Sequence, residues 1–415
     1  MSRVLALCFL LLAAVIGFLH IDSRPAWAPF VPNTITTVEA EVEVAAPPKS
    51  KNQSIPSKVI IASPISTWLP DTSAASVHAA SLIALKDGAI RAFWFAGSRE
   101  GAKDVVINSA VFDPKSSNWS APTVVMDRVS AEKGLSRYIA KLGNPVPARM
   151  TDGRLQLFFV TVSIGGWAGS SISSVISDDE GLTWSNPRRL ISSPLINLST
   201  LVKSPTISFA DGRLGLPAYH EWIGRFGEFL RIDGGQVIDK RRMSSGRSAI
   251  QPMVFVNDAQ DATAYFRQTR SAGQAKQVPV SQTQNAGQSW QSGADLPIAN
   301  PNAAVTGLQL NNGARILVLN NLERGRYRLV LMMADAKSGQ WQTIEVLEDD
   351  EALPEDQRKE FSYPYLISLD GNDAHLVYTW DRKKIRHRHF SGAWLKHAQS
   401  QLGAIPVDVN TQEVK

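Results

Sequence analysis

Short runs in which apolar and polar residues alternate fill the chain from about residue 58 onward, as in residues 155–160 and 374–378. Pairs of turn-forming residues separate these runs: Asp87-Gly88, Asp152-Gly153, Asp211-Gly212, Asn257-Asp258, Asn312-Gly313 and Asp370-Gly371. Asp-Gly and Asn-Gly between strand-forming runs are typical of β-hairpins. No long stretch of this body has the 3.6-residue period of a helix. The pattern therefore predicts an all-β body built from hairpins.

An eight-residue box repeats within this body. Residues 177–184 have the form S-x-D-x-G-x-T-W, and residues 283–290 repeat it with Asn for Asp. Their tryptophans, Trp184 and Trp290, lie 106 positions apart (290 − 184), which is twice 53. Weaker copies come at residues 113–119, 232–237, 335–341 and 392–394. Six units of two hairpins each predict a six-bladed β-propeller. We interpret the boxes as structural, with Asp folding over its own turn and Trp packing between blades.

The N-terminus carries a different pattern. An apolar run covers residues 4–19 behind Arg3, and Ala26-Trp27-Ala28 resembles a cleavage signal, although Pro29 follows it unfavourably. We expect an uncleaved signal anchor that exports the body to the periplasm or cell exterior, with membrane contact through this segment. A cleaved signal, giving a secreted protein, and a buried helix are the alternatives.

These patterns divide the chain into four parts. Residues 1–22 form the signal or anchor, 23–57 a flexible linker, 58–397 the propeller and 398–415 a tail. Within the linker, residues 34–58 resemble a tether in composition, with a short edge strand at 38–44 as the alternative. We expect residues 59–61 to pair into the last blade and close the ring.

The composition of the chain excludes several kinds of partner and catalytic site. Lys and Arg total 43 against 38 Asp and Glu, a net charge of +5 that is too small and dispersed for a nucleic-acid binder. Cys8 is the only cysteine, which excludes disulfides, cysteine zinc sites and a thiol nucleophile in the body. We expect a monomer with no cofactor and no metal site. His387 and His389 share one strand face, which we interpret as a solvated basic edge.

Several segments carry a family resemblance: residues 78–82, 93–105, 144–146, 250–252, 361–364 and 378–382. Together with the boxes, they resemble the Asp-box (BNR repeat) proteins of the sialidase (neuraminidase) superfamily, over about residues 57–390. The resemblance implies a sialidase-like propeller whose loops gather a glycan site at the mouth of the central channel.

The resemblance also implies site residues. Arg99 matches a substrate-contacting arginine, with Glu100 beside it, and Asp104 matches the acid/base aspartate. Arg267 matches a carboxylate-binding arginine, and Arg328, or its neighbour Arg326, matches another. Tyr363 matches the nucleophile of the sialidase mechanism. For Arg99, Glu100 and Asp104 the alternative is a surface ion-pair cluster at a turn.

Two positions depart from the family pattern. His78-Ala79-Ala80 stands where the family has Arg-Ile-Pro, so one carboxylate arginine is missing. Gln251 stands where the nucleophile's glutamate is expected, and an amide cannot accept the tyrosine proton. Glu221, next to His220, is the best substitute for that base. His78 is either an acid/base or sugar-binding group or a satisfied inner-strand histidine, and His220-Glu221 is either catalytic or a loop-packing pair.

Three functions fit these residues. The first is an exported glycoside hydrolase acting on an acidic oligo- or polysaccharide other than an ordinary sialoside. The second is a polysaccharide lyase with His78 or Tyr363 as base. The third is a non-catalytic glycan-binding propeller. Arginines in the depression suit an anionic sugar through charge-assisted hydrogen bonds. We expect Asp104 to be the proton donor, because a carboxyl shielded by its loop keeps its proton more easily.

Overall fold

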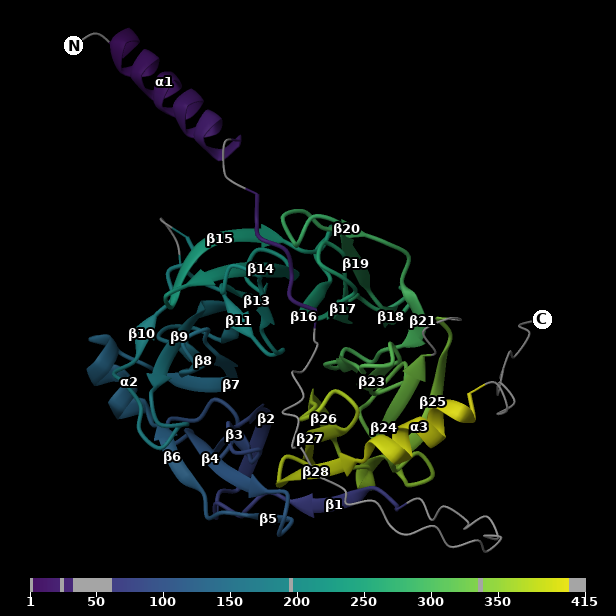
Figure 1. The fold of residues 1–415 in the computed structure, drawn as a ribbon. Coiled ribbons are helices and arrows are strands. Elements are labelled where there is room, and N and C mark those ends of the chain that lie inside the picture. The colour runs from purple at the N-terminus through teal and green to yellow at the C-terminus, as the bar shows by residue number, and fades with distance from the viewer. Residues whose placement is uncertain (1–2, 23–25, 33–61, 194–196, 335–338, 403–415) are drawn as a thin grey trace, which may run out of the picture.

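The computed structural model describes residues 3–22, 26–32, 62–193, 197–334 and 339–402. Six antiparallel sheets stand around a central channel as the blades of a propeller, and the chain passes through them in order (Figure 1). The predicted six-bladed β-propeller is confirmed. The apolar faces of neighbouring sheets pack against each other, so the core lies between blades; Phe158, Leu216 and Ile250 from three successive blades share one such cluster.

The strands of each blade are given from the channel outward. The first blade consists of β2 (Ser76–Ala84), β3 (Ile90–Gly97) and β4 (Val106–Asp113) with β5 (Asn118–Trp119) and β6 (Thr123–Met126), and the second of β7 (Lys141–Arg149), β8 (Leu155–Val162), β9 (Ser170–Ser177) and β10 (Arg188–Arg189). The third blade consists of β11 (Leu201–Val202) with β12 (Ile207–Ser208), β13 (Leu214–His220), β14 (Phe226–Asp233) and β15 (Gln236–Arg242).

The fourth blade consists of β16 (Ala249–Val256), β17 (Ala262–Gln268), β19 (Val280–Thr283) and β20 (Gln291–Ser292), with a small sheet of β18 (Gln277–Val278) and β21 (Leu296–Ala299) beside it. The fifth consists of β22 (Thr306–Gln309), β23 (Arg315–Leu319), β24 (Arg328–Ala334) and β25 (Trp341–Asp349). The sixth consists of β26 (Phe361–Ile367), β27 (Ala374–Trp380), β28 (Lys384–Phe390) and β1 (Ile65–Trp68).

The repeated box closes a turn between the two outer strands of a blade. Ser177 Oγ accepts from the Gly181 N–H at 2.8 Å and donates to Asp179 at 2.7 Å, while Asp179 accepts from both the N–H and the hydroxyl of Thr183. Gly181 has φ +91°, which only glycine adopts cheaply. Trp184 then packs edge-on against Phe93 of the preceding blade at 5.7 Å. The structural interpretation of the boxes is therefore confirmed.

The ring closes through a strand from the N-terminal side of the propeller. Strand β1 pairs antiparallel with β28, from Ile65 opposite His389 to Trp68 opposite Arg386. The predicted closing residues 59–61, the predicted tether at 34–58 and the possible strand at 38–44 lie outside the described residues. The closing strand removes the free edge of the last blade.

The chain begins with helix α1 (Arg3–Asp22), whose described side chains, at positions 4–17, are exposed. In the part of the chain that the structure describes, no helix combines the length and apolar character needed to cross a membrane.

Residues 26–32 do not behave as the predicted linker. Trp27 and Phe30 are buried, at 7% and 2% exposure, against Phe209 and Phe229 of the third blade. The Trp27 indole N–H donates to Asp239 at 3.0 Å. Aromatic burial outweighs the entropy of ordering this stretch, so it belongs to the core.

Short helices complete the fold. They are α2 (Arg128–Leu135), α3 (Gly392–Ser400) and two 3-10 turns, η1 (Trp167–Gly169) and η2 (Glu355–Gln357). Helix α3 crosses the expected end of the propeller at residue 397, and the weak box at 392–394 lies in this helix rather than in a hairpin. Ser391 caps its first turn and Leu395 is buried beneath it.

The prediction of a solvated edge at His387 and His389 is wrong. His387 is 1% exposed and packs against Phe112 and Trp119 of the first blade, and the side chain of His389 is only 25% exposed. The reason is strand β1, which covers β28 and converts an edge into an inner strand.

Candidate functional site

The innermost strands of four blades share an irregularity that prepares the site. Each contains a β-bulge at which one non-glycine residue adopts a left-handed conformation: Ala79, Asn144, Gln251 and Tyr363, with φ between +44° and +54°. A bulge re-aims side chains and is common beside functional sites. In three of the four, proline follows and leaves no N–H unsatisfied where the ladder is interrupted. The fold thus presents Asn144, Gln251 and Tyr363 in equivalent positions.

These bulge residues meet in a buried polar cluster. The Gln251 amide nitrogen lies 3.3 Å from the Tyr363 hydroxyl and 3.2 Å from that of Tyr219, and the Asn144 amide lies 3.4 Å from Tyr219. The sequence correctly indicated that Gln251 lies beside Tyr363. Burial, followed by the influence of Tyr363, raises the pKa of Tyr219 well above its usual range. Tyr219 was missed, because nothing in its strand sequence separates it from a core tyrosine.

Three arginines from different blades form a row beside this cluster. Arg267 donates to Asn302 Oδ1 at 2.6 Å, and its Nη1 lies 3.5 Å from the Tyr363 hydroxyl. Arg326 donates to the Asn302 carbonyl at 2.9 Å and to Glu360 at 3.0 Å.

Arg382 completes the row. It donates to Glu360 at 2.9 Å and to Glu100 at 2.5 Å. Burial opposes ionisation of Glu360, but hydrogen bonds from Arg382 and Ser362 and the charge of Arg326 lower its pKa to about 2. Glu100 therefore joins the site as the partner of an arginine.

Arg326, and not Arg328, belongs to the arginine row. Arg328 pairs instead with Asp349 and Glu351 at the outer strand β25, at 3.6 and 3.2 Å. Arg326, two residues earlier, lies in the loop before β24 and reaches the site. The family resemblance covers residues 378–382 but assigns no role to Arg382. Asp381 and Arg382 both have left-handed backbone conformations, which turn the chain toward the arginine row.

His78 lies behind Tyr363. Its ring lies 4.3 Å from the Tyr363 ring and is 1% exposed, and neither ring nitrogen has a hydrogen-bond partner among the residues that the structure describes. Burial, and then the charge of Arg382, lower its pKa to about 3, so the ring is neutral. The expectation of a satisfied inner-strand histidine is wrong, and a pKa this low does not suit an acid or base near neutrality.

His220 is the last residue of β13 and Glu221 follows the strand, and their side chains have different surroundings. Glu221 is half-buried, and burial raises its pKa although the charges of Arg267 and Arg225 oppose this. Glu221 lies two residues after Tyr219, and its backbone N–H donates to the Ser199 hydroxyl at 2.8 Å. His220 instead stacks on Phe226 at 4.8 Å and accepts from the Ile223 N–H at 3.1 Å, so it packs its own loop.

Asp104 and Arg99 lie on an exposed turn. The Ser98 hydroxyl and N–H both donate to the Asp104 carboxylate at 2.9 Å and lower its pKa. The expected shielding of Asp104 is therefore wrong: in this conformation the carboxyl is exposed and ionised. No contact of the described residues joins Arg99 to the arginine row.

A buried lysine lies on the blade opposite to Tyr363. Lys203, directly after β11, donates to the Pro364 carbonyl and lies 5.5 Å from the Tyr365 ring centre. Burial lowers its pKa to about 7. Lys203 braces the bulge that carries Tyr363, and no sequence pattern singled it out.

Space for a ligand adjoins the row. A cavity of about 510 Å³ is lined by Arg324, Gly325, Arg326, Tyr327, Glu355, Arg358, Lys359 and Glu360. Four basic side chains against two acidic ones suit an anionic ligand. A larger depression of about 950 Å³ lies between the outer strands of the second and third blades, but none of the residues of the tyrosine and arginine clusters lines it. We therefore take the arginine row as the candidate site, with this cavity beside it; Arg326 and Glu360 belong to both.

Comparison with known proteins agrees with this fold. A model of the BNR repeat-like domain matches residues 88–376, which is more than half of the chain. No curated protein matches significantly.

Among solved structures, a protein of unknown function from Dyadobacter fermentans is similar over 79% of this chain and 97% of its own, with 12% identity and a TM-score of 0.64. The NanB sialidase of Streptococcus pneumoniae (K499G mutant) is similar over 78% and 70%, with 11% identity and a TM-score of 0.62. A leech intramolecular trans-sialidase is similar over 80% and 70%, with 14% identity and a TM-score of 0.60. These structures share its sialidase-like fold, and by its matched domain the chain belongs to the BNR repeat-like family.

Proposed function

We propose that the protein is a glycoside hydrolase that acts on an acidic glycan other than an ordinary sialoside. The observation that carries the proposal is Arg267. Its hydrogen-bond partners among the described residues are neutral, namely Asn302, Gln251 and the Tyr363 hydroxyl. A half-buried guanidinium without a carboxylate partner favours binding of an anionic group, because charge-assisted hydrogen bonds are about twice as strong as neutral ones.

The same arrangement supports a substrate other than an α-sialoside. Arg326 and Arg382 are both neutralised by Glu360, and Arg382 also by Glu100. His78, neutral and buried, stands where a further arginine would hold the carboxylate. One open arginine suits the carboxylate of a sugar such as a uronic acid, whereas the sialidase pattern holds its carboxylate with three arginines.

Hydrolysis needs a proton donor at the leaving oxygen. Glu221 fits this role best, since its raised pKa keeps more of the carboxyl protonated than an exposed glutamate would. When the glycosidic C–O bond breaks, Glu221 would give its proton to the leaving oxygen. The Tyr363 hydroxyl, held by Gln251 and Arg267, would face the anomeric carbon. A water molecule would add its oxygen to that carbon as the new hydroxyl, and the proton that it releases would restore the carboxyl of Glu221.

One observation supports a non-catalytic, glycan-binding alternative. Gln251 cannot take the proton of Tyr363, so the tyrosine lacks the base of the family pattern. A lyase that uses His78 is less favoured, because a base with a pKa of about 3 removes a sugar proton poorly.

Product analysis separates these functions. We would incubate the purified full-length protein with a panel of uronic- and ulosonic-acid oligosaccharides, with the Glu221→Gln variant as control. New reducing ends without ultraviolet absorbance, lost in the variant, would support the proposal. An unsaturated product would indicate elimination instead, binding without turnover would support the glycan-binding alternative, and rapid cleavage of an ordinary α-sialoside would contradict the substrate assignment.

A further inference from the structure

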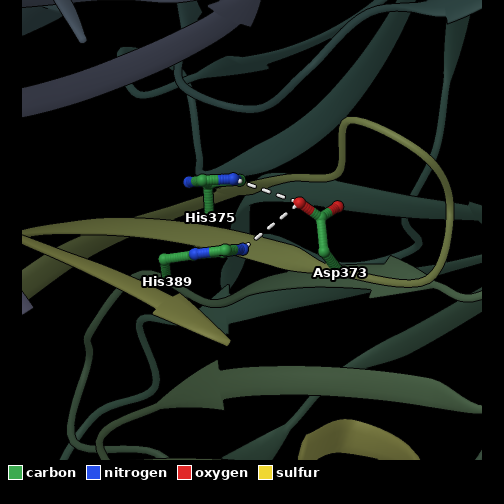
Figure 2. Close-up of side chains that lie close together, drawn as sticks. All are labelled: Asp373, His375 and His389. Atoms are coloured by element: carbon green, nitrogen blue, oxygen red, sulfur yellow. Dashed lines mark ion pairs between the residues drawn. The ribbon is translucent and has the colours of Figure 1, made fainter. Parts of the chain in front are cut away.

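We infer that Asp373, His375 and His389 form a binding site for a divalent transition metal of the Zn²⁺ class, at the end of the sixth blade remote from Tyr363 (Figure 2). Asp373 ends the hairpin before β27, His375 lies on β27, and His389 lies directly opposite His375 on β28. Their ligand atoms all lie within 4.8 Å of one another. The antiparallel register thus brings an aspartate and two histidines together without any sequence motif.

The spacing fits tetrahedral coordination. The distance from Asp373 Oδ2 to His375 Nε2 is 3.1 Å, and to His389 Nε2 it is 3.5 Å. Zinc bonds to imidazole nitrogen and carboxylate oxygen are about 2.0–2.1 Å long, so the edges of a tetrahedron around the ion measure about 3.3–3.4 Å. The two observed edges lie on either side of this value.

An unsatisfied nitrogen points to a ligand. The His375 side chain is 1% exposed, yet within the described part of the chain its Nε2 makes no hydrogen bond with acceptable geometry, although Asp373 Oδ2 lies 3.1 Å away. A buried polar atom without a partner is costly. A metal ion bound to the lone pair of this nitrogen would satisfy it.

Neighbouring groups hold the ligands as outer-shell partners of a metal usually do. The second carboxylate oxygen of Asp373 accepts from the Ser368 hydroxyl at 2.7 Å and the Leu369 N–H at 2.8 Å. His375 Nδ1 lies 3.0 Å from His387 Nε2, and His387 Nδ1 lies 3.2 Å from the Thr67 hydroxyl.

This relay can adopt the tautomer that metal binding requires. The Thr67 hydroxyl accepts from the Trp119 indole at 3.3 Å and has a second lone pair that can accept from His387 Nδ1–H. His387 Nε2 then accepts from His375 Nδ1–H. In this tautomer the lone pair of His375 Nε2 faces Asp373 and His389, as an ion requires; the reversed relay places a proton on that nitrogen, which an incoming ion displaces.

Binding requires one adjustment. The rings of His375 and His389 stack in parallel, with centroids 4.1 Å apart and planes at 4° (Figure 2). One ring must tilt for both lone pairs to meet at a single ion. The His389 side chain, 25% exposed, has room to do so, and the same exposure gives solvent access to a fourth coordination position.

The location gives the ion a structural role. Ser362 of β26 pairs with Thr379, whereas Ile367, at the other end of the strand, pairs with His375. The metal ligands therefore lie four residue steps along β27 from the level of Tyr363, about 13 Å at 3.3 Å per residue. Through His387 and Thr67 the site also contacts β1, so a bound ion would fasten the strand that closes the ring.

The test titrates Zn²⁺ into the full-length protein, purified without a histidine tag and treated with a chelator. We expect one ion per chain with a Kd below about 10 µM, and a melting temperature raised by a few degrees at 100-fold excess over Kd. His389→Gln and Asp373→Asn should each weaken binding at least about 10-fold, whereas the exposed His397→Gln should not.

Cobalt gives a second readout that does not depend on variant stability. Co²⁺ in the intact protein should produce the intense visible absorption of a tetrahedral complex, which Zn²⁺ then displaces. Zinc binding that is equal in the parent, His389→Gln and Asp373→Asn proteins, or a parent protein that binds no Zn²⁺ at tenfold excess over 10 µM, would overturn the inference. Neither result bears on hydrolysis, so this inference and the proposed function fail or stand separately.

Discussion

The polar side chains of the box turns and those of the tyrosine and arginine clusters differ in how completely they are hydrogen-bonded. In the box at residues 177–184, Ser177 and Asp179 satisfy one another and the backbone in a closed set of hydrogen bonds. At the tyrosine and arginine clusters, no carboxylate of the described residues bonds to Arg267, and neither ring nitrogen of His78 has a hydrogen-bond partner among them. Closed networks stabilise a fold, whereas incomplete ones leave binding capacity for a ligand.

The strongest test of this comparison changes the proposed proton donor. Glu221→Gln should lower kcat on an acidic glycan by about 10²–10⁴-fold, the usual contribution of a positioned acid. Asp104→Asn should lower it less than about tenfold, because the Asp104 carboxyl is already ionised and exposed. Steady-state rates of the two variants decide which carboxyl donates the proton. A larger loss of kcat in Asp104→Asn than in Glu221→Gln would assign that role to Asp104.

The next test separates an open arginine from a satisfied one. Arg267→Ala should weaken binding of the acidic sugar by about 10–100-fold, as expected for loss of a charge-assisted hydrogen bond worth about 1.5–3 kcal/mol. Arg328→Ala is the matched control, since its guanidinium is occupied by Asp349 and Glu351. Calorimetry or KM measurements should show weaker binding of the acidic sugar only for Arg267→Ala. Equal losses of affinity in both variants would mean that Arg267→Ala acts by disturbing the fold.

The buried histidine predicts a pH dependence. His78 has a pKa of about 3 in the folded protein and about 6.5 when unfolded, so the unfolded state binds the extra proton between these values. Its contribution to stability is fully present above pH 6.5 and falls by about 1.4 kcal/mol per pH unit toward pH 3. His78→Phe should flatten this part of the stability curve in denaturant titrations. An unchanged slope would show that other groups set it.

A substitution in the box at residues 177–184 should have the smallest effect of the four. Ser177→Ala removes a buried hydroxyl that holds Asp179 and the Gly181 N–H, and should cost about 1–3 kcal/mol of unfolding free energy. At temperatures where the variant is folded, its kcat and KM should equal those of the parent. A selective loss of activity would break the distinction between the two regions.

Much of the fold could be predicted because its signals are local. Glycine turns and box residues satisfy themselves within eight positions, so their spacing reveals the blades. The pairing of Gln251 with Tyr363 was also accessible, through the family pattern.

The rest of the site depends on contacts between distant blades. Tyr219, Arg382 and Lys203 look like ordinary strand, turn and core residues until the ring brings them together. The choice of Arg326 over Arg328 turned on whether a side chain lies before or within strand β24. The histidine cluster required knowledge of strand register, and its burial required knowledge that β1 covers it.

The aromatic anchor at Trp27 and Phe30 constrains how the chain is processed. A peptidase that cut after Ala28 would remove Trp27 from its contacts with Phe209, Phe229 and Asp239, and uncover apolar surface on the third blade. A shortened protein that starts at residue 33 would lose Phe30 as well and become prone to aggregate. Maturation that spares the propeller must therefore cut before Trp27, or leave the N-terminal helix attached for the life of the protein.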